Sequence, residues 1–479
     1  MQVLEHLEPK KVFSLFEEMC AIPHGSRNTK AISDWCAAFA KERGLEYYQD
    51  EANNIIIIKP AAPGYENAQP VVLQGHLDMV CEKAAGCTKD MDREVLDLAI
   101  DGDFVYAKGT TLGSDDGIAV AMAMAILDDK DLPAPRIEAV FTTDEEIGLL
   151  GATALDVSPL KGKKMINLDS EAEGIFTVSC AGGNTTACTL PVTRASFEGS
   201  CLTVTVGGLT GGHSGAEIHK GRANSNMLMG RVLRSLAQKT DLRIERVDGG
   251  LKDNAIPVET RATVLVADLQ AAQQLADEME QILKNEYSTT DPSLFVKAEA
   301  AQSTQLPMDK DSTGKVICML QCLPNGIEAM SADIHGLVQT SLNMGILVTH
   351  EADVCASYSV RSSVDSQKQM LKDRLCCLME QLGGRVEFSG EYTGWQYQEH
   401  SPLRELMVEV FQEQYGKAPK IEAIHAGLEC GIFAGKMPGL DCVSLGPDLL
   451  EIHTPREKMS ISSVQRVWKF LLEVLKRSK

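Results

Sequence analysis

Hydrophobic residues follow two different spacings in the first part of the chain. At Lys10–Cys20 and 28–43 they recur every three or four positions, which predicts amphipathic helices. Short apolar runs predict buried strands at 54–58, 70–74, 136–142 and 164–168. Because segments of helical length separate these strands, the pattern is typical of a largely parallel sheet with helices on both faces.

Residues 114–127 form an apolar run rich in Ala and Met, and this run predicts a buried helix. Asp115 and Asp116 stand at its beginning. We therefore expect both carboxylates in the first helical turn, where the helix dipole favours negative charge.

The pattern of elements changes after residue 186. Strands are predicted at 202–206, 242–247, 261–266 and 294–298, with helices at 222–238 and 271–283. This order, β-α-β-β-α-β, is typical of a ferredoxin-like unit, and a partial echo of it follows at 314–389. From residue 401 the chain again alternates strands and helices, as in its first part. We predict an α/β domain formed by 1–186 and 395–479, interrupted by an inserted α+β domain at 187–394.

Charge and composition exclude several classes of protein. Lys and Arg number 46 against 67 Asp and Glu, which gives a net charge of −21 and disfavours nucleic acid and anionic membranes as partners. We find neither a signal peptide nor an apolar run of membrane-spanning length. The 14 cysteines are scattered without a C-x-x-C motif, so we expect reduced thiols and a cytoplasmic location.

Side chains able to bind metal ions follow several of the predicted strands. They are His76 and Asp78, Glu145 and Glu146, Asp169, His453, and Asp115 with Asp116 at the helix start. Open α/β sheets bind ligands beyond the carboxyl ends of their strands, so we expect these groups to converge. Two His with several carboxylates suit Zn²⁺, Mn²⁺ or Co²⁺. The number of carboxylates also fits a two-metal site with one bridging group.

Each of these residues also has an ordinary structural explanation. A single His after a strand is often a surface residue, Asp115 and Asp116 could only cap a helix, and Glu145 with Glu146 could form an exposed turn. The coincidence of five such positions at strand ends and a helix start favours a metal site.

Five sequence blocks resemble, in order, the M20 family of co-catalytic zinc metallopeptidases. They are His76-x-Asp78, the GSDDG at 113–117, the DEEIG at 144–148, the NLDS at 167–170 and the IHT at 452–454. The resemblance spans nearly the whole chain, and its long insertion is typical of a dipeptidase branch. Many M20 members have Asp-Asp-Lys-Gly where this chain has Asp115-Asp116-Gly117. The dipeptidase branch also lacks that lysine.

The resemblance implies a role for each residue of these blocks. One zinc ion would be held by His76 and Asp169, the other by Glu146 and His453, and Asp115 would bridge them. Asp78 would accept a hydrogen bond from His76, and Glu145 would be the general base. A cis peptide is expected between Asp115 and Asp116.

The inserted domain would act as a lid and a dimerisation domain by the same resemblance. His213 would stabilise the oxyanion, and the substrate would be held by Asn254, Arg361 and Gly427. The planar guanidinium of Arg361 suits a peptide carboxylate, because it can bind both oxygens at once. The resemblance also implies a homodimer.

The expected function is hydrolysis of unblocked dipeptides, Xaa-His among them, at a site with two divalent ions. Two alternatives stay open. The first is another M20 activity, such as that of a tripeptidase or an N-acyl amino-acid deacylase. The second is a catalytically silent metal-binding protein on the same fold, against which the presence of Glu145 argues.

Overall fold

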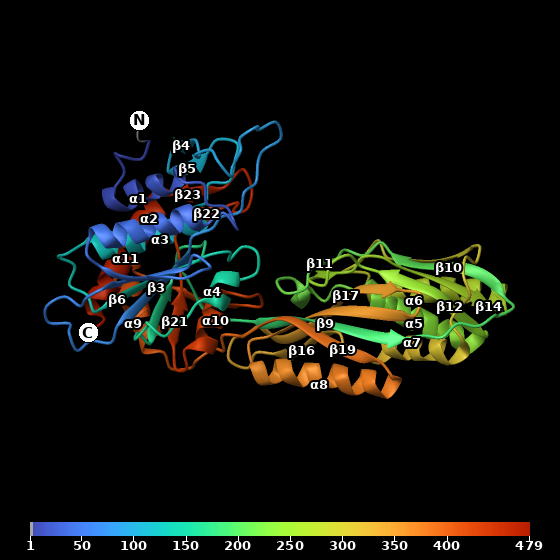
Figure 1. Cartoon of the computed structure of the whole chain (residues 1–479). Coiled ribbons are helices and arrows are strands. Elements are labelled where there is room, and N and C mark those ends of the chain that lie inside the picture. The colour runs from blue at the N-terminus through green and yellow to red at the C-terminus, as the bar shows by residue number, and fades with distance from the viewer. Residues whose placement is uncertain (1–2) are drawn as a thin grey trace. The chain divides into compact units, whose positions relative to one another are not determined.

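A computed structural model describes residues 3–479 and divides into two compact units. The first contains the described residues up to Ser179, with Tyr397–Ala423 and Leu428–Lys479; the second contains Cys180–Gln396 and Ile424–Gly427. In Figure 1 the second unit runs from green to orange. The division lies a few residues from the predicted boundaries at 187 and 394, because the strand Gly182–Pro191 belongs to the sheet of the second unit.

An eight-stranded sheet forms the centre of the first unit. Its strands, in spatial order, are β1 (Glu46–Gln49), β2 (Ile55–Lys59), β6 (Ile137–Thr142), β3 (Val71–His76), β7 (Lys164–Asn167), β21 (Asp441–Ser444), β8 (Ile175–Cys180) and β20 (Lys420–Ile424). The four strands from β6 to β21 run parallel to one another, whereas β1, β2 and β8 pair antiparallel to their neighbours. Every residue of β3 and β6 is buried, as expected of central strands covered on both faces. The predicted α/β class is confirmed.

Seven helices of the first unit accompany this sheet. They are α1 (Lys10–Cys20), α2 (Lys30–Glu42), α3 (Ser114–Asp128), α4 (Leu150–Ala154), α9 (Pro402–Tyr415), α10 (Glu429–Lys436) and α11 (Ile461–Arg477). Helix α3 is buried from Ser114 to Leu127, which explains why its sequence shows no polar face. Apolar side chains of α1, α3, α9 and α11 share one core with the sheet.

A small sheet in the first unit was not predicted. It consists of β22 (Leu449–Leu450), β23 (Lys458–Ser460), β5 (Phe104–Ala107) and β4 (Leu98–Asp101). These strands have two to four residues each, too few to show a periodic pattern. The sheet holds both ends of the loop 451–457, which carries His453.

The second unit contains two ferredoxin-like halves in one nine-stranded sheet. The first half is β10 (Ser200–Gly207), α5 (Ser225–Lys239), β12 (Leu242–Gly249), β14 (Thr260–Val266), α6 (Leu269–Glu286) and β15 (Phe295–Ala300). The second half is β9 (Gly182–Pro191), α7 (Lys310–Cys322), β17 (Val338–Thr349), β18 (Asp353–Ser362), α8 (Asp365–Leu382) and β19 (Arg385–Tyr392). Both have the spatial order fourth, first, third, second strand, and β12 pairs with β17 where they meet.

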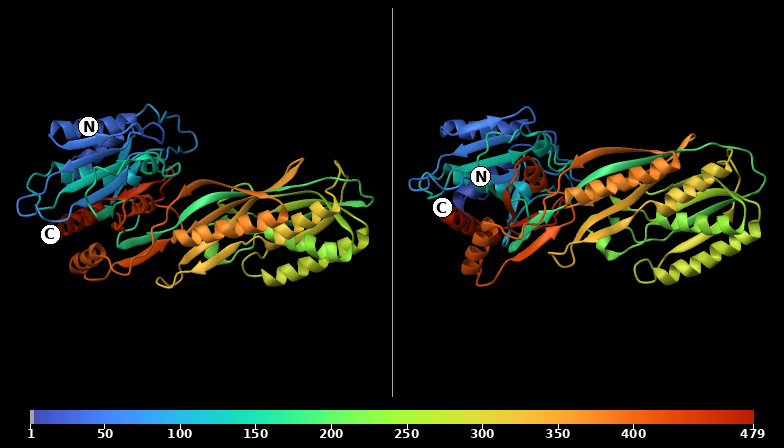
Figure 2. Two further views of the ribbon diagram at one scale, coloured as in Figure 1. Left: turned by 60° about the horizontal axis from the view of Figure 1, so that its bottom comes forward. Right: turned by 90° about the horizontal axis from the view of Figure 1, so that it is seen from below.

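The predicted echo is therefore a complete second half, whose first strand precedes the first half in the chain. Neighbouring helices contact each other in the order α6, α5, α7, α8. Figure 2 shows all four in front of the strands when this unit is seen from below. Short elements complete the unit: β11 (Gly212–His213), β13 (Ala255–Ile256), β16 (Gly326–Met330) and a 3₁₀ turn, Ile218–Lys220. Across residues 3–479, no helix is both long and apolar enough to span a membrane.

Candidate active site

The carboxyl ends of β3, β6 and β7 place the predicted metal ligands of the first unit together. His76 is the last residue of β3, and Asp169 follows β7. Nε2 of His76 lies 3.2 Å from Oδ1 of Asp115 and 3.7 Å from Oδ1 of Asp169. These three side chains form the first group of potential ligands.

A second group forms around the other oxygen of Asp115. Oδ2 of Asp115 lies 3.1 Å from Nε2 of His453, and the same nitrogen lies 2.9 Å from Oε1 of Glu146. The Asp115 carboxylate thus directs one oxygen to each group. This is the arrangement that a bridging carboxylate between two ions requires.

The backbone at Asp115 differs from the prediction of a first helical turn. Asp115 and Asp116 are joined by a cis peptide, and their φ and ψ angles are not helical, so regular helix begins after them. The carboxylate of Glu457 binds this segment instead: it accepts hydrogen bonds from the amides of Leu112 and Ser114 at 2.7 and 2.8 Å. Glu457 therefore orients the residues that lead into Asp115, and the sequence did not indicate it.

Gly75 allows the second carboxylate of this pair to approach β3. Oδ2 of Asp116 accepts a hydrogen bond from the His76 amide at 3.2 Å. A Cβ at Gly75 would lie 2.5 Å from the same oxygen, so a side chain at this position would displace Asp116.

Asp78 faces His76 through its backbone as well as its side chain. Nδ1 of His76 lies 2.9 Å from the backbone carbonyl of Asp78, whereas the Asp78 carboxylate is 3.6 Å away. That carboxylate accepts hydrogen bonds from the Ser26 hydroxyl and the Glu145 amide, at 2.8 and 3.0 Å. Asp78 thus orients His76 through its backbone and fixes the loop of Glu145 through its side chain.

Two non-glycine residues near these groups adopt left-handed backbone angles. Asp144 has a φ of 53° and His453 a φ of 59°. Such conformations cost free energy and persist where the surroundings enforce them, as happens often at functional sites. Asp144 directly precedes Glu145, and His453 is itself one of the potential ligands.

Crowded acidic groups give this site unusual electrostatics. Burial raises the pKa of Glu145 well above its usual range, with further contributions from Asp169 and Glu429. Burial likewise raises the pKa of Glu146 and of Asp169. Asp115 and Glu146 raise the pKa of His453 to about 10. A divalent cation would relieve the repulsion among these carboxylates.

The donor set fits two divalent cations. Oε1 of Glu146 is buried and forms no hydrogen bond, although His453 lies close by. Three residue triplets have potential ligand atoms within 4.8 Å of one another: His76 with Asp116 and Asp169, His76 with Glu145 and Glu146, and Asp115 with Glu146 and His453. Mixed imidazole and carboxylate donors suit Zn²⁺, Mn²⁺ or Co²⁺.

A buried polar network lies beneath these ligands, and sequence reasoning missed its centre, Glu429. Oε2 of Glu429 accepts hydrogen bonds from Gln74 at 2.5 Å and Thr142 at 2.6 Å. Asn167 donates in turn to Gln74 at 2.5 Å. Since Gln74, Thr142 and Asn167 lie on β3, β6 and β7, this network ties together the three strands that carry the site. Burial raises the pKa of Glu429 to about 8.

Replacing Glu429 by Ala is expected to lower the free energy of unfolding by roughly 2–4 kcal/mol, because the buried donors of Gln74 and Thr142 lose their acceptor. Glu429→Gln keeps one acceptor oxygen and serves as the matched control, with a smaller loss. Urea denaturation of the metal-free proteins measures both effects. An Ala variant as stable as the parent would contradict the role of this network.

Residues of the second unit form a separate polar cluster. Nδ1 of His213 accepts hydrogen bonds from the amides of Gly215 and Ala216, at 3.2 and 3.0 Å, so its proton is on Nε2. Arg361 donates from Nη1 to the Tyr392 hydroxyl at 3.3 Å, and its Nε is buried without a partner. Burial lowers the pKa of His213, and the nearby positive charge of Arg361 lowers it further.

Gly427 and Asn254 flank this cluster. The ring of Tyr392 packs on Gly427 so closely that a Cβ there would lie 2.9 Å from it. Asn254 has an exposed side chain, and its carbonyl accepts a hydrogen bond from the Ser214 amide at 2.9 Å, next to His213. Tyr392 was not predicted, and no signal in its surrounding sequence indicates it.

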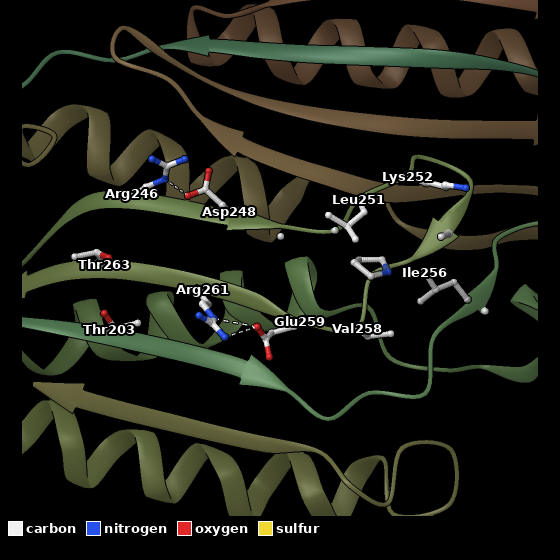
Figure 3. A pocket seen from close by; sticks show the side chains of 15 residues that line it. Thr203, Arg246, Asp248, Leu251, Lys252, Ile256, Val258, Glu259, Arg261 and Thr263 are labelled. Atoms are coloured by element: carbon white, nitrogen blue, oxygen red, sulfur yellow. Dashed lines mark hydrogen bonds and ion pairs between the residues drawn. The ribbon is translucent and has the colours of Figure 1, made fainter. Parts of the chain in front are cut away.

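A cavity of about 960 Å³ in the second unit lies along β12, β14 and residues 250–252, as Figure 3 shows. Two ion pairs lie among its lining side chains, Arg246 with Asp248 and Arg261 with Glu259. None of the predicted substrate-binding residues is among those that line it. We therefore do not assign this cavity to the substrate.

Comparison with known proteins decides the family. Residues 72–477 match the model of Peptidase family M20/M25/M40. The chain belongs to this family. It is 38% identical to the cytosol non-specific dipeptidase of Escherichia coli (strain K12), over 99% of both chains. The chain is thus a peptidase, a hydrolase of peptide bonds.

Two solved structures are similar to this chain. The aminoacylhistidine dipeptidase from Vibrio alginolyticus superposes with a TM-score of 0.94 at 36% identity, covering 99% of this chain and 97% of the other. The aminopeptidase PepT from Bacillus cereus ATCC 10987 gives a TM-score of 0.55 at 16% identity, covering 98% and 99%. The second likeness shows a shared fold.

Proposed function

We propose that this M20 peptidase hydrolyses unblocked dipeptides, Xaa-His among them, with two divalent cations and Glu145 as general base. The observation that carries the proposal is the likeness over nearly the whole chain to two proteins named as dipeptidases. The two groups of ligands that share Asp115 support the dinuclear site.

His76 and Asp169 would hold one cation, Glu146 and His453 the other, and Asp115 would bridge them, with zinc as the expected metal and manganese or cobalt as substitutes. Two such cations would activate the attacking water and polarise the scissile carbonyl. The chain's own residues supply the remaining steps.

Glu145 would move the proton. Its amide is held by Asp78, and its raised pKa makes it a stronger base than an exposed carboxylate. It would take a proton from the water and pass it to the leaving amine. Nε2–H of His213 would donate to the oxyanion, because its other ring nitrogen already accepts two backbone hydrogen bonds.

Substrate choice tests this function against its two alternatives. A screen with free dipeptides, tripeptides and N-acylated amino acids should show turnover of dipeptides with a free amino group. Preferred cleavage of tripeptides or of N-acyl substrates would favour another M20 activity. Metal binding without turnover of any of these substrates would favour a catalytically silent protein.

Replacing Arg361 by Ala is expected to raise KM for free dipeptides strongly, because the substrate carboxylate loses its cationic partner. For the same reason, the parent enzyme should cleave carboxyl-amidated dipeptides poorly. Steady-state kinetics on matched free and amidated substrates measure both effects. Equal cleavage of the two forms by the parent would show that the carboxylate is not bound this way.

We propose a cytoplasmic location, which is supported by the name of the E. coli relative and by the 14 free cysteines. We also propose a homodimer, so sedimentation at assay concentration should give twice the mass of one chain. Full activity in a species with the mass of one chain would contradict the dimer. His213 and Arg361 come from the two halves of one unit and lie near each other. One chain would then supply both residues, and this would explain the activity of a monomer.

A further inference from the structure

One buried histidine of the second unit has no assigned role. His425 lies in the segment Ile424–Gly427, two residues before Gly427, and only 7% of its surface is exposed. Nε2 of its ring is 2.7 Å from the Ser341 hydroxyl. The other nitrogen, Nδ1, is buried without a hydrogen-bond partner.

Counting hydrogen bonds places the proton of His425 on Nδ1. If the Ser341 hydroxyl donates to Nε2, only the Nδ1–H group is left unsatisfied. If Nε2–H donates to Ser341 instead, both the serine proton and the Nδ1 lone pair lack partners. Since unsatisfied buried polar groups are costly, the first arrangement is favoured. His425 therefore presents a free N–H donor.

This donor lies in the cluster of Arg361. Ser341, which holds the His425 ring, is the direct Cα partner of Arg361 in the pairing of β17 with β18. Burial, together with the charges of Arg361 and His213, lowers the pKa of His425 to about 3. Its ring is therefore a neutral donor. Nε of Arg361 is likewise buried without a partner.

The cluster holds no carboxylate paired with Arg361 among the residues that the structure describes. Nη1 of Arg361 donates instead to the neutral hydroxyl of Tyr392. The nearby Asp253 accepts a hydrogen bond from Thr185. The positive charge of Arg361, its Nε–H group and the Nδ1–H group of His425 together suit a single carboxylate, because a carboxylate has two oxygens and about four lone-pair sites.

We propose that His425 donates from Nδ1 to the carboxylate of the bound dipeptide, beside Arg361. The inference rests on the proposed function and extends it, because it makes recognition of the carboxylate depend on two side chains. His425 is then a substrate-binding residue that acts on affinity and leaves the chemical step unchanged.

Three substitutions of His425 separate this role from packing. His425→Phe keeps a ring but removes the donor, and should raise KM for free dipeptides about 10- to 100-fold with kcat nearly unchanged. Cleavage of carboxyl-amidated dipeptides should not change. His425→Asn places an amide near Nδ1 and should recover part of the loss, whereas His425→Gln reaches towards Ser341 and should not. His335→Phe, at an exposed histidine of the same unit, is the control.

Calorimetric binding tests the inference without turnover. A free dipeptide is titrated into the Glu145→Gln enzyme, with and without His425→Phe, and the added substitution should weaken binding about 10- to 100-fold. An equal loss for free and amidated dipeptides, or unchanged KM and binding, would overturn the role of His425. Binding of the free form that needs His425 but is followed by no cleavage in the parent would support His425 and contradict the proposed function.

Discussion

Replacing Glu145 by Gln is expected to lower kcat by ~10²–10⁴-fold while the metal content stays near that of the parent. Gln keeps the shape of the side chain but cannot accept the proton of the attacking water. The Glu145 amide would still bind Asp78, so the loop should keep its conformation. Metal analysis and steady-state kinetics on the same preparation test this expectation.

Glu146 provides the matched comparison, because it is adjacent in the chain and has the same side chain. Oε1 of Glu146 lies 2.9 Å from Nε2 of His453, within the second ligand group. Glu146→Ala should weaken the binding of one ion, and excess zinc should restore part of the activity. A Glu145→Gln variant that loses a metal equivalent, or that turns over like the parent, would show that the two roles are wrongly divided. If both variants keep metals and activity, the site lies elsewhere.

Removal of the divalent ions by a chelator is expected to abolish activity, and zinc should restore it more effectively as the pH rises. The reason is the competition between protons and metal at His453, whose pKa is raised to about 10 by Asp115 and Glu146 in the metal-free site. Below that pH the ring is protonated, and a proton must leave before the nitrogen can bind a cation. Affinity should therefore increase about tenfold per pH unit for each proton released.

Zinc titrations of the chelated protein at pH 6, 7 and 8 measure this dependence, with a competing chelator to set the free zinc concentration. Asp115→Ala is the informative variant, because it removes the oxygen shared by both groups and should weaken both ions. Activity that persists after complete removal of metal would contradict a dinuclear site. Affinity independent of pH would show that His453 is not a ligand.

The order of elements could largely be predicted from the sequence. Helix α1 has the predicted bounds, and the β-α-β-β-α-β order of 202–298 has the expected spatial arrangement. These elements are governed by the spacing of apolar residues, which is a local property. The complete second half could not be predicted, because its first strand, β9, is separated from α7 by the whole of the first half.

The candidate site likewise has one part that the sequence predicted and one part that it did not. His76, Glu146, Asp169 and His453 could be proposed together because the carboxyl ends of neighbouring strands meet. The apolar pattern around Asp115 is that of a buried helix and did not indicate the non-helical conformation there, whereas the family resemblance implied the cis peptide to Asp116. The conformation at Asp115 depends on Glu457, which is 342 positions away.

By itself, the sequence determined the fold class, and it predicted a division of the chain into two parts and the side chains that we propose hold two cations. Only the tertiary structure decided which buried polar groups support them. Glu429 reaches Gln74 across 355 positions, and His425 meets Ser341 across 84. A buried polar group must find a partner, but its identity depends on how distant strands and loops pack, and periodicity carries no information about that.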